Sequence, residues 1–133
     1  MPYRKDIKLI EQGNNSDLIT EADVAKFTMI YPMVKLVQNE MSTLSTTQQD
    51  GVLNNLKFKI INNLINSARE LLIKEPILEY LEQLDNEILP QNSDVVIILC
   101  QYIEALDQYT TKNKLYSHFG IYQWSTQENP VQE

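Results

Sequence analysis

The sequence predicts an all-α protein, folded as a single-domain helical bundle. Its 133 residues include only three glycines and five prolines, which favours a few long elements over many short strands. Apolar residues recur at spacings of three and four through most of the chain, as they do along one face of an α-helix. A chain of this length can bury a sizeable core without disulfides or a metal.

The most hydrophobic stretch, residues 93–110, is expected to be the central helix that the other segments cover. Ser93 and Asp94 can cap its start. The run at 95–99 alone also fits a buried strand, but the helical pattern continues to residue 109 and a lone strand has no pairing partner. Its apolar arc is wide, so burial on more than one side is expected. The predicted buried face consists of Val95, Ile98, Leu99, Tyr102, Ala105, Leu106 and Tyr109.

A second helix is predicted over residues 21–44. Thr20 can cap it, and acidic residues in its first turn suit the positive end of the helix dipole. Pro32 lies inside the pattern and removes one backbone donor, so a kink is expected there. The apolar stripe of this helix comprises Phe27, Ile30, Val34, Val37, Met41 and Leu44.

Two further main helices are predicted, over residues 49–74 and 77–89, which makes four in all. Both follow from apolar residues at helical spacing, and Pro76 separates them because the residue before a proline avoids helical geometry. A short N-terminal helix over 3–12 is also expected. Residues 1–124 are thus assigned to the bundle domain, and residues 125–133 to a polar, weakly ordered tail.

The charge pattern bears on the class of partner. The formal net charge is −7 and the sequence pI is near 4.7, without the basic face that nucleic-acid binders use. An anionic membrane surface is disfavoured for the same reason. A basic protein partner is compatible with this charge but not implied by it. One cysteine, the lack of a signal-type apolar core and the lack of a membrane-length apolar run together predict a cytoplasmic protein.

Catalytic and metal-binding patterns are sparse. Cys100 lies within the apolar run and is expected to be an inert core thiol, and His118, the one histidine, is expected at the rim of the fold. One cysteine and one histidine are too few for a zinc site, and isolated glycines make no phosphate loop. We therefore expect no enzyme, no metal and no cofactor. The carboxylate pairs are interpreted as a solvated acidic face: Glu79 with Glu82, and Glu104 with Asp107.

The strongest candidate for a partner-binding surface is the aromatic segment 115–124. Its large residues are of the types enriched at binding hot spots: Tyr116, Phe119, Tyr122 and Trp124. They either form a lid that completes the core, or are exposed and meet another chain. A self-complementary patch of this kind would make a symmetric homodimer.

These observations predict a non-enzymatic protein-interaction or regulatory module. Two alternatives stay open. A small apolar ligand or pigment would lie between helices, in a cavity lined by Met29, Met33, Met41 and aromatics. An enzyme that works through carboxylates alone would depend on Glu79 or Glu104.

Overall fold

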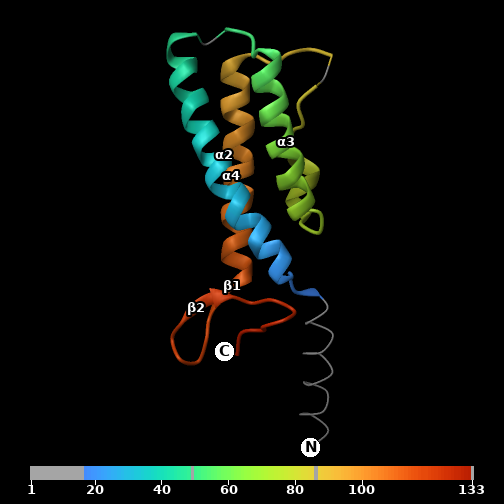
Figure 1. Ribbon diagram of the computed structural model, residues 1–133, viewed down its shortest axis with the longest axis vertical. Coiled ribbons are helices and arrows are strands. Elements are labelled where there is room, and N and C mark those ends of the chain that lie inside the picture. Colours follow the sequence, from blue (N-terminus) through green and yellow to red (C-terminus); the bar gives the residue numbers. More distant parts are fainter. Residues whose placement is uncertain (1–16, 49, 86, 133) are drawn as a thin grey trace, which may run out of the picture. The chain divides into compact units, whose positions relative to one another are not determined.

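The computed structural model describes residues 17–48, 50–85 and 87–132. The predicted helix over 3–12 lies outside these residues. The described chain is mostly helical, as predicted, and has a small antiparallel hairpin after the last helix (Figure 1). The elements are α2 (Glu21–Thr47), α3 (Asn55–Leu71), the short 3₁₀ helix η1 (Pro76–Tyr80), α4 (Asn92–Asn113), β1 (Lys114–Tyr116) and β2 (Tyr122–Trp124).

The chain divides into two compact units. Residues 26–108 form the helical unit, which holds most of α2 and α4 together with α3 and η1. The hairpin unit contains, among the described residues, 17–25 and 109–132. The predicted boundary between a bundle and a tail at residue 124 stays a prediction.

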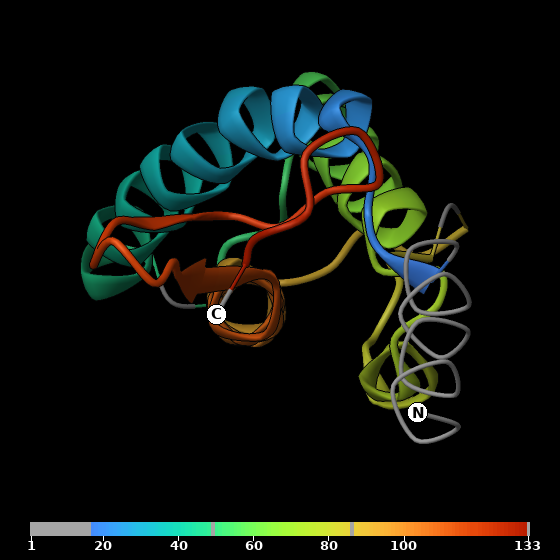
Figure 2. The same ribbon diagram turned by 90° about the horizontal axis from the view of Figure 1, so that it is seen from below.

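The core of the helical unit lies between α2, α3 and α4. Figure 2 shows α4 end-on, with α2 crossing the view and α3 to the right. Most of the predicted stripe on α4 is confirmed, because Val95, Leu99 and Tyr102 are fully buried, whereas Ile98 is only half-buried. Apolar side chains at helical spacing on the other two helices complete the core. They are Phe27, Ile30, Val34 and Met41 from α2, and Ile61, Ile65, Ala68 and Leu71 from α3.

The predicted helix over 77–89 is wrong. Only Pro76–Tyr80 is helical, as a single 3₁₀ segment, and the described residues from 81 to 90 have no regular structure. Distant side chains hold this segment: the Arg69 guanidinium donates to the Leu81 carbonyl at 3.3 Å, and the Tyr102 hydroxyl donates to the Glu82 carbonyl at 2.7 Å. These two carbonyls accept from side chains and not from the backbone N–H groups of an α-helix. As a result α4 is buried along one broad face only, and Ile97 is exposed on the other side.

The helix starts are set by the connection from α2 to α3. α3 begins at residue 55 and not 49, because the preceding segment pairs with the start of α4: Leu53 N–H donates to Pro90 O at 3.0 Å and Asn92 N–H to Gly51 O at 2.9 Å. Gly51 approaches Asn92 so closely that a Cβ there would lie 2.9 Å from the amide nitrogen Nδ2. α2 runs unbroken through Pro32 to Thr47. The expected kink stays a prediction.

The hairpin unit corrects the expectation that the chain contains no strand. β1 and β2 pair antiparallel, and Gly120 takes the positive φ of 81° that the tip requires. The segment after β2 is also better ordered than expected of a polar tail. Thr126 is fully buried and forms a bridge with Ile19, and its hydroxyl donates to Glu21 at 2.8 Å.

None of the described helices is long and apolar enough to cross a bilayer.

Candidate functional site

The hairpin places three of the four predicted partner-binding residues, Tyr116, Tyr122 and Trp124, on one face. The neighbouring pairs 113–125 and 117–121 are hydrogen-bonded, since Ser125 N–H donates to Asn113 O and Ser117 N–H to Ile121 O, each at 2.8 Å. The pairs between them, 114–124 and 116–122, are therefore of the non-hydrogen-bonded type, in which side chains lie closest. The Tyr116 and Tyr122 rings accordingly lie 4.8 Å apart between centroids.

Burial separates the four aromatic residues into two groups. Trp124 is half-buried, with its ring 6.3 Å from that of the buried Tyr109, as the lid interpretation expects. The other three are exposed, from 43% for Tyr122 to 79% for Phe119. Ile121, which the sequence interpretation did not single out, is 56% exposed on the same hairpin. We name the set Tyr116, Phe119, Ile121 and Tyr122 the hairpin patch.

The hairpin that carries this patch is held by its own hydrogen bonds. The Ser117 hydroxyl oxygen accepts from the backbone N–H groups of Phe119 at 3.3 Å and Ile121 at 3.2 Å, which fixes the tip. Lys114 Nζ lies 5.0 Å from the Tyr122 ring centroid and 5.5 Å from that of Trp124, within the range of cation–π attraction. A patch fixed in this way loses little conformational entropy when it binds.

Cys100 is not the core thiol that the sequence suggests. It is exposed on α4, and Gln38 Nε2 approaches its sulfur at 3.3 Å. The apolar run led to the wrong expectation because Cys100 follows the buried Leu99 and lies off the stripe that continues to Tyr102. His118 is at the rim, as expected: it is exposed in the hairpin tip, with its ring 4.0 Å from that of Phe119.

The candidate catalytic carboxylates Glu79, Glu82 and Glu104 are all exposed to solvent. The described residues contain no group of three or more His, Cys, Asp and Glu that could hold a metal ion. Asp107 accepts a hydrogen bond from the Tyr31 hydroxyl. This bond, followed by burial, raises the pKa of Tyr31 to about 12.

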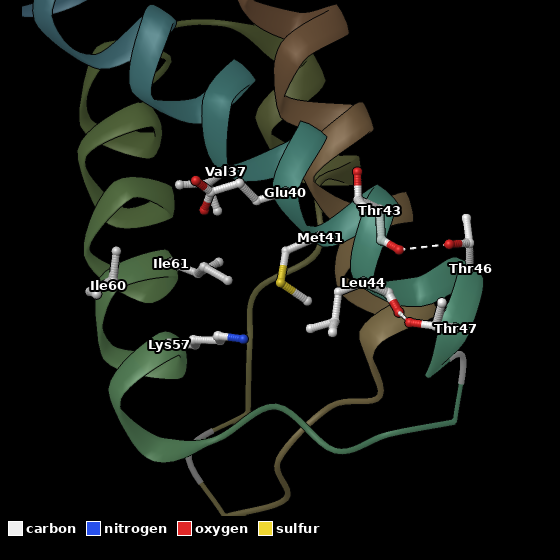
Figure 3. Close-up of a pocket in the computed structure, with 10 residues that line it drawn as sticks. All are labelled: Val37, Glu40, Met41, Thr43, Leu44, Thr46, Thr47, Lys57, Ile60 and Ile61. Carbon is white, nitrogen blue, oxygen red and sulfur yellow. Dashed lines mark hydrogen bonds between the residues drawn. The ribbon is translucent and has the colours of Figure 1, made fainter.

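A hollow of about 450 Å³ lies between α2 and α3. Figure 3 shows Met41 and Leu44 from α2, and Lys57 and Ile61 from α3, extending into the space between the helices. Of the three methionines predicted to line a ligand cavity, only Met41 does so. Met29 and Met33 are exposed, because they lie on α2 away from its buried stripe of Phe27, Ile30, Val34 and Met41. We name this feature the α2–α3 hollow.

Comparison of the chain with protein-family models, with curated proteins and with solved structures finds no match.

Proposed function

We propose that this protein is a non-enzymatic protein-interaction module and that the hairpin patch is its partner-binding surface. The observation that carries the proposal is the exposure of four large apolar side chains on one short hairpin, with Phe119 at 79%. Tyrosine and phenylalanine bury large areas and lose few rotamers on binding, which is why aromatic residues are enriched at interfaces. A regulatory role and a cytoplasmic location belong to the same proposal.

The patch favours a protein surface over a nucleic acid. Lys114 is the cation that contacts its rings, and the chain as a whole carries a net charge of −7. Nucleic-acid binding requires several cations against phosphates. An apolar patch with aromatic anchors instead matches the buried centre of a protein interface. The partner is a second copy of this chain or a different protein.

The first test is native mass spectrometry of the whole protein and of the double variant Tyr116→Ser/Phe119→Ser. We expect a dimer that the double variant loses, because two aromatic anchors are removed from the self-complementary patch. The matched control is Ile73→Ser, which removes another exposed apolar side chain, 68% accessible, in the turn that follows α3. A dimer that persists in the double variant, or is lost in the control, contradicts self-association through the patch.

If the protein is a monomer, the partner is a different protein, and the same variants test it. The chain is immobilised, and partners retained from native lysate are compared between the wild type, the double variant and the control. We expect a specific partner to be lost only from the double variant. A partner retained equally by all three proteins would show that the hairpin patch does not bind it.

A second candidate function is the binding of a small apolar ligand in the α2–α3 hollow. The supporting observation is its composition: Val37, Met41 and Ile61 supply apolar surface, and one residue of each charge, Glu40 and Lys57, lies at the same hollow. About 450 Å³ is within the range of small-molecule sites. A ligand that is mainly apolar fits this arrangement.

Native mass spectrometry also tests this second candidate. A copurified ligand would add mass that disappears on denaturation, and Leu44→Trp, which fills the hollow, is expected to abolish it. The control is Leu36→Trp, because Leu36 is exposed on α2 and does not line the hollow. Bare protein mass together with no thermal stabilisation by a long-chain fatty acid would exclude this function.

A further inference from the structure

Because the described residues from 81 to 90 are not helical, one side of α4 stays uncovered and forms a groove. Two hollows adjoin along it, one of about 570 Å³ beside η1 and one of about 430 Å³ beside the 82–90 segment. Ile97 and Gln101 line both hollows, so the two are neighbours along α4, and together they form the groove. We name it the η1–α4 groove. Its main apolar side chains are Ile77, Tyr80, Leu84, Ile88, Val96 and Ile97.

Three of these apolar side chains are largely exposed. Ile97 is 59%, Ile88 71% and Tyr80 73% accessible. Single exposed apolar residues are ordinary on a protein surface, but a set that lines one groove marks an interaction site. The groove therefore has the surface of an interface that nothing within the described chain covers.

The charged residues of the groove all have one sign. Glu82, Asp85 and Asp94 line one hollow and Glu104 the other, and no Lys or Arg from the described residues lines either. Lys35 lines a separate hollow between α2 and α4 that shares Glu104 with the groove. The negative character is consequently strongest at the Asp94 end.

The wall of the groove is fixed before any partner arrives. The buried Tyr102 hydroxyl donates to the Glu82 carbonyl at 2.7 Å and accepts from Arg69 at 3.0 Å, and Arg69 also donates to the Leu81 carbonyl. These bonds tie the segment after η1 to α4 and to α3. The Arg69 guanidinium donates these bonds to neutral groups, and within the described residues it forms no ion pair with a rim carboxylate.

The dimensions match a helical guest. Asp94 and Glu104 are ten positions apart on α4, which is roughly 15 Å at the helical rise per residue. About three turns of an opposing helix cover that length. Such a helix places apolar residues at i, i+3, i+4 and i+7 in the groove and directs its flanking side chains to the rim.

We propose that the η1–α4 groove binds a basic amphipathic helix of another protein. Its apolar face lies on Tyr80, Ile88 and Ile97, and its Lys or Arg residues face the rim carboxylates. Charge complementarity selects this occupant. An anionic lipid surface would be repelled by the rim, and a second copy that used the same groove would set carboxylates against carboxylates.

The test uses the full chain and a defined probe. The probe is a fluorescent helical peptide of leucine and lysine, about four turns long, with leucine on one face. Its counterpart has glutamate in place of every lysine. We expect the basic peptide to bind, with an affinity that falls as salt is added, and the acidic peptide not to bind. Equal binding of both peptides, or binding of neither, overturns the proposal.

Variants then locate the binding. Ile97→Ser is expected to lower the affinity for the basic peptide about tenfold, because it removes an apolar anchor. The exposed control Ile73→Ser should leave this affinity unchanged. The double variant Asp85→Asn/Asp94→Asn is expected to lower the affinity for the basic peptide about fivefold at low salt. Its control, Asp17→Asn/Asp50→Asn, removes the same charge from exposed positions outside the groove and should cost less than twofold. Equal losses in the groove and control variants would show non-specific attraction and refute the site.

This proposal stands apart from the hairpin patch. The Tyr116→Ser/Phe119→Ser variant should bind the basic peptide as the wild type does, whatever its effect on self-association. A dimer that Ile97→Ser dissociates would show a second copy in the groove and would overturn the proposed occupant. Circular dichroism of each variant confirms that the helices persist.

Discussion

The two units are stabilised in different ways. In the helical unit the buried side chains that the structure describes are apolar except for Asn92, and Val95, Leu99 and Leu106 on α4 are all inaccessible. In the hairpin unit several buried residues are polar, namely Asn113, Ser125 and Thr126. The first unit depends on the removal of apolar surface from water, and the second on hydrogen bonds between segments far apart in the chain. Substitutions that remove one kind of interaction should therefore affect one unit and spare the other.

The largest effect is expected for Leu99→Ala. This side chain is fully buried at the centre of α4, so the loss of transfer energy and the cavity left behind should lower the free energy of unfolding by about 2–5 kcal/mol. The control, Ile97→Ala on the exposed side of the same helix, should change it by less than about 0.5 kcal/mol. Urea denaturation measures both. Similar losses for the two variants would mean that the open side of α4 is covered in solution.

A smaller effect is expected for Tyr102→Phe, which keeps the ring and removes the hydroxyl. The variant loses the hydrogen bonds to Glu82 O and from Arg69 at a buried position, which should lower the free energy of unfolding by about 2 kcal/mol. The same variant should speed hydrogen exchange in the segment after η1, since that segment loses an anchor. Unchanged exchange there would show that the hydroxyl does not hold the wall of the groove.

Thr126→Val tests the hairpin unit. The two residues have similar shapes, but valine cannot donate to Glu21 or accept from the Asn129 N–H at 3.0 Å. We expect a loss of about 1 kcal/mol, seen as reduced exchange protection across β1 and β2 with α3 unaffected. Thr43→Val, an exposed threonine that bonds only within α2, is the matched control. Equal loss of protection in both units would contradict their separate stabilisation.

The smallest effect concerns alkaline pH. The hydrogen bond to Asp107 holds the pKa of Tyr31 at about 12, above its ordinary value of 10.0, so the folded state retains this proton longer than the unfolded state does. The stabilisation is fully present below pH 10 and is lost as pH rises towards 12. Ultraviolet titration should show late-ionising tyrosines, and Tyr31→Phe should remove one of them. An unchanged late phase would assign it to the buried Tyr102, whose pKa burial also raises.

The contrast between the units also explains what the sequence could predict. The stripes on α2 and α4 were for the most part predictable because spacings of three and four report burial on a helix face. The 77–89 segment has the same spacing, yet Arg69 and Tyr102 capture its carbonyls, and those contacts join positions 12 and 20 residues apart. Local periodicity contains no trace of such contacts.

The candidate sites were likewise predictable only where local sequence was enough. Tyr116, Phe119 and Tyr122 were recognisable by residue type, but their exposure depends on a hairpin with strands of three residues each. Strands this short give too little alternation to be recognised. The η1–α4 groove was out of reach altogether, because it exists only where an expected helix does not form.

The bridge between Ile19 and Thr126 has a mechanical consequence. The two segments run parallel, and Gln127 strengthens their junction by donating its backbone N–H to Ile19 O at 2.8 Å and its side-chain amide to Leu18 O at 2.7 Å. A force that pulls the two ends of the chain apart therefore shears this junction, so that its hydrogen bonds share the load. Residues 26–108 lie between the two segments along the chain and carry no tension until the junction breaks. In a single-molecule pulling experiment, the junction thus acts as a latch whose rupture precedes the unravelling of the helices.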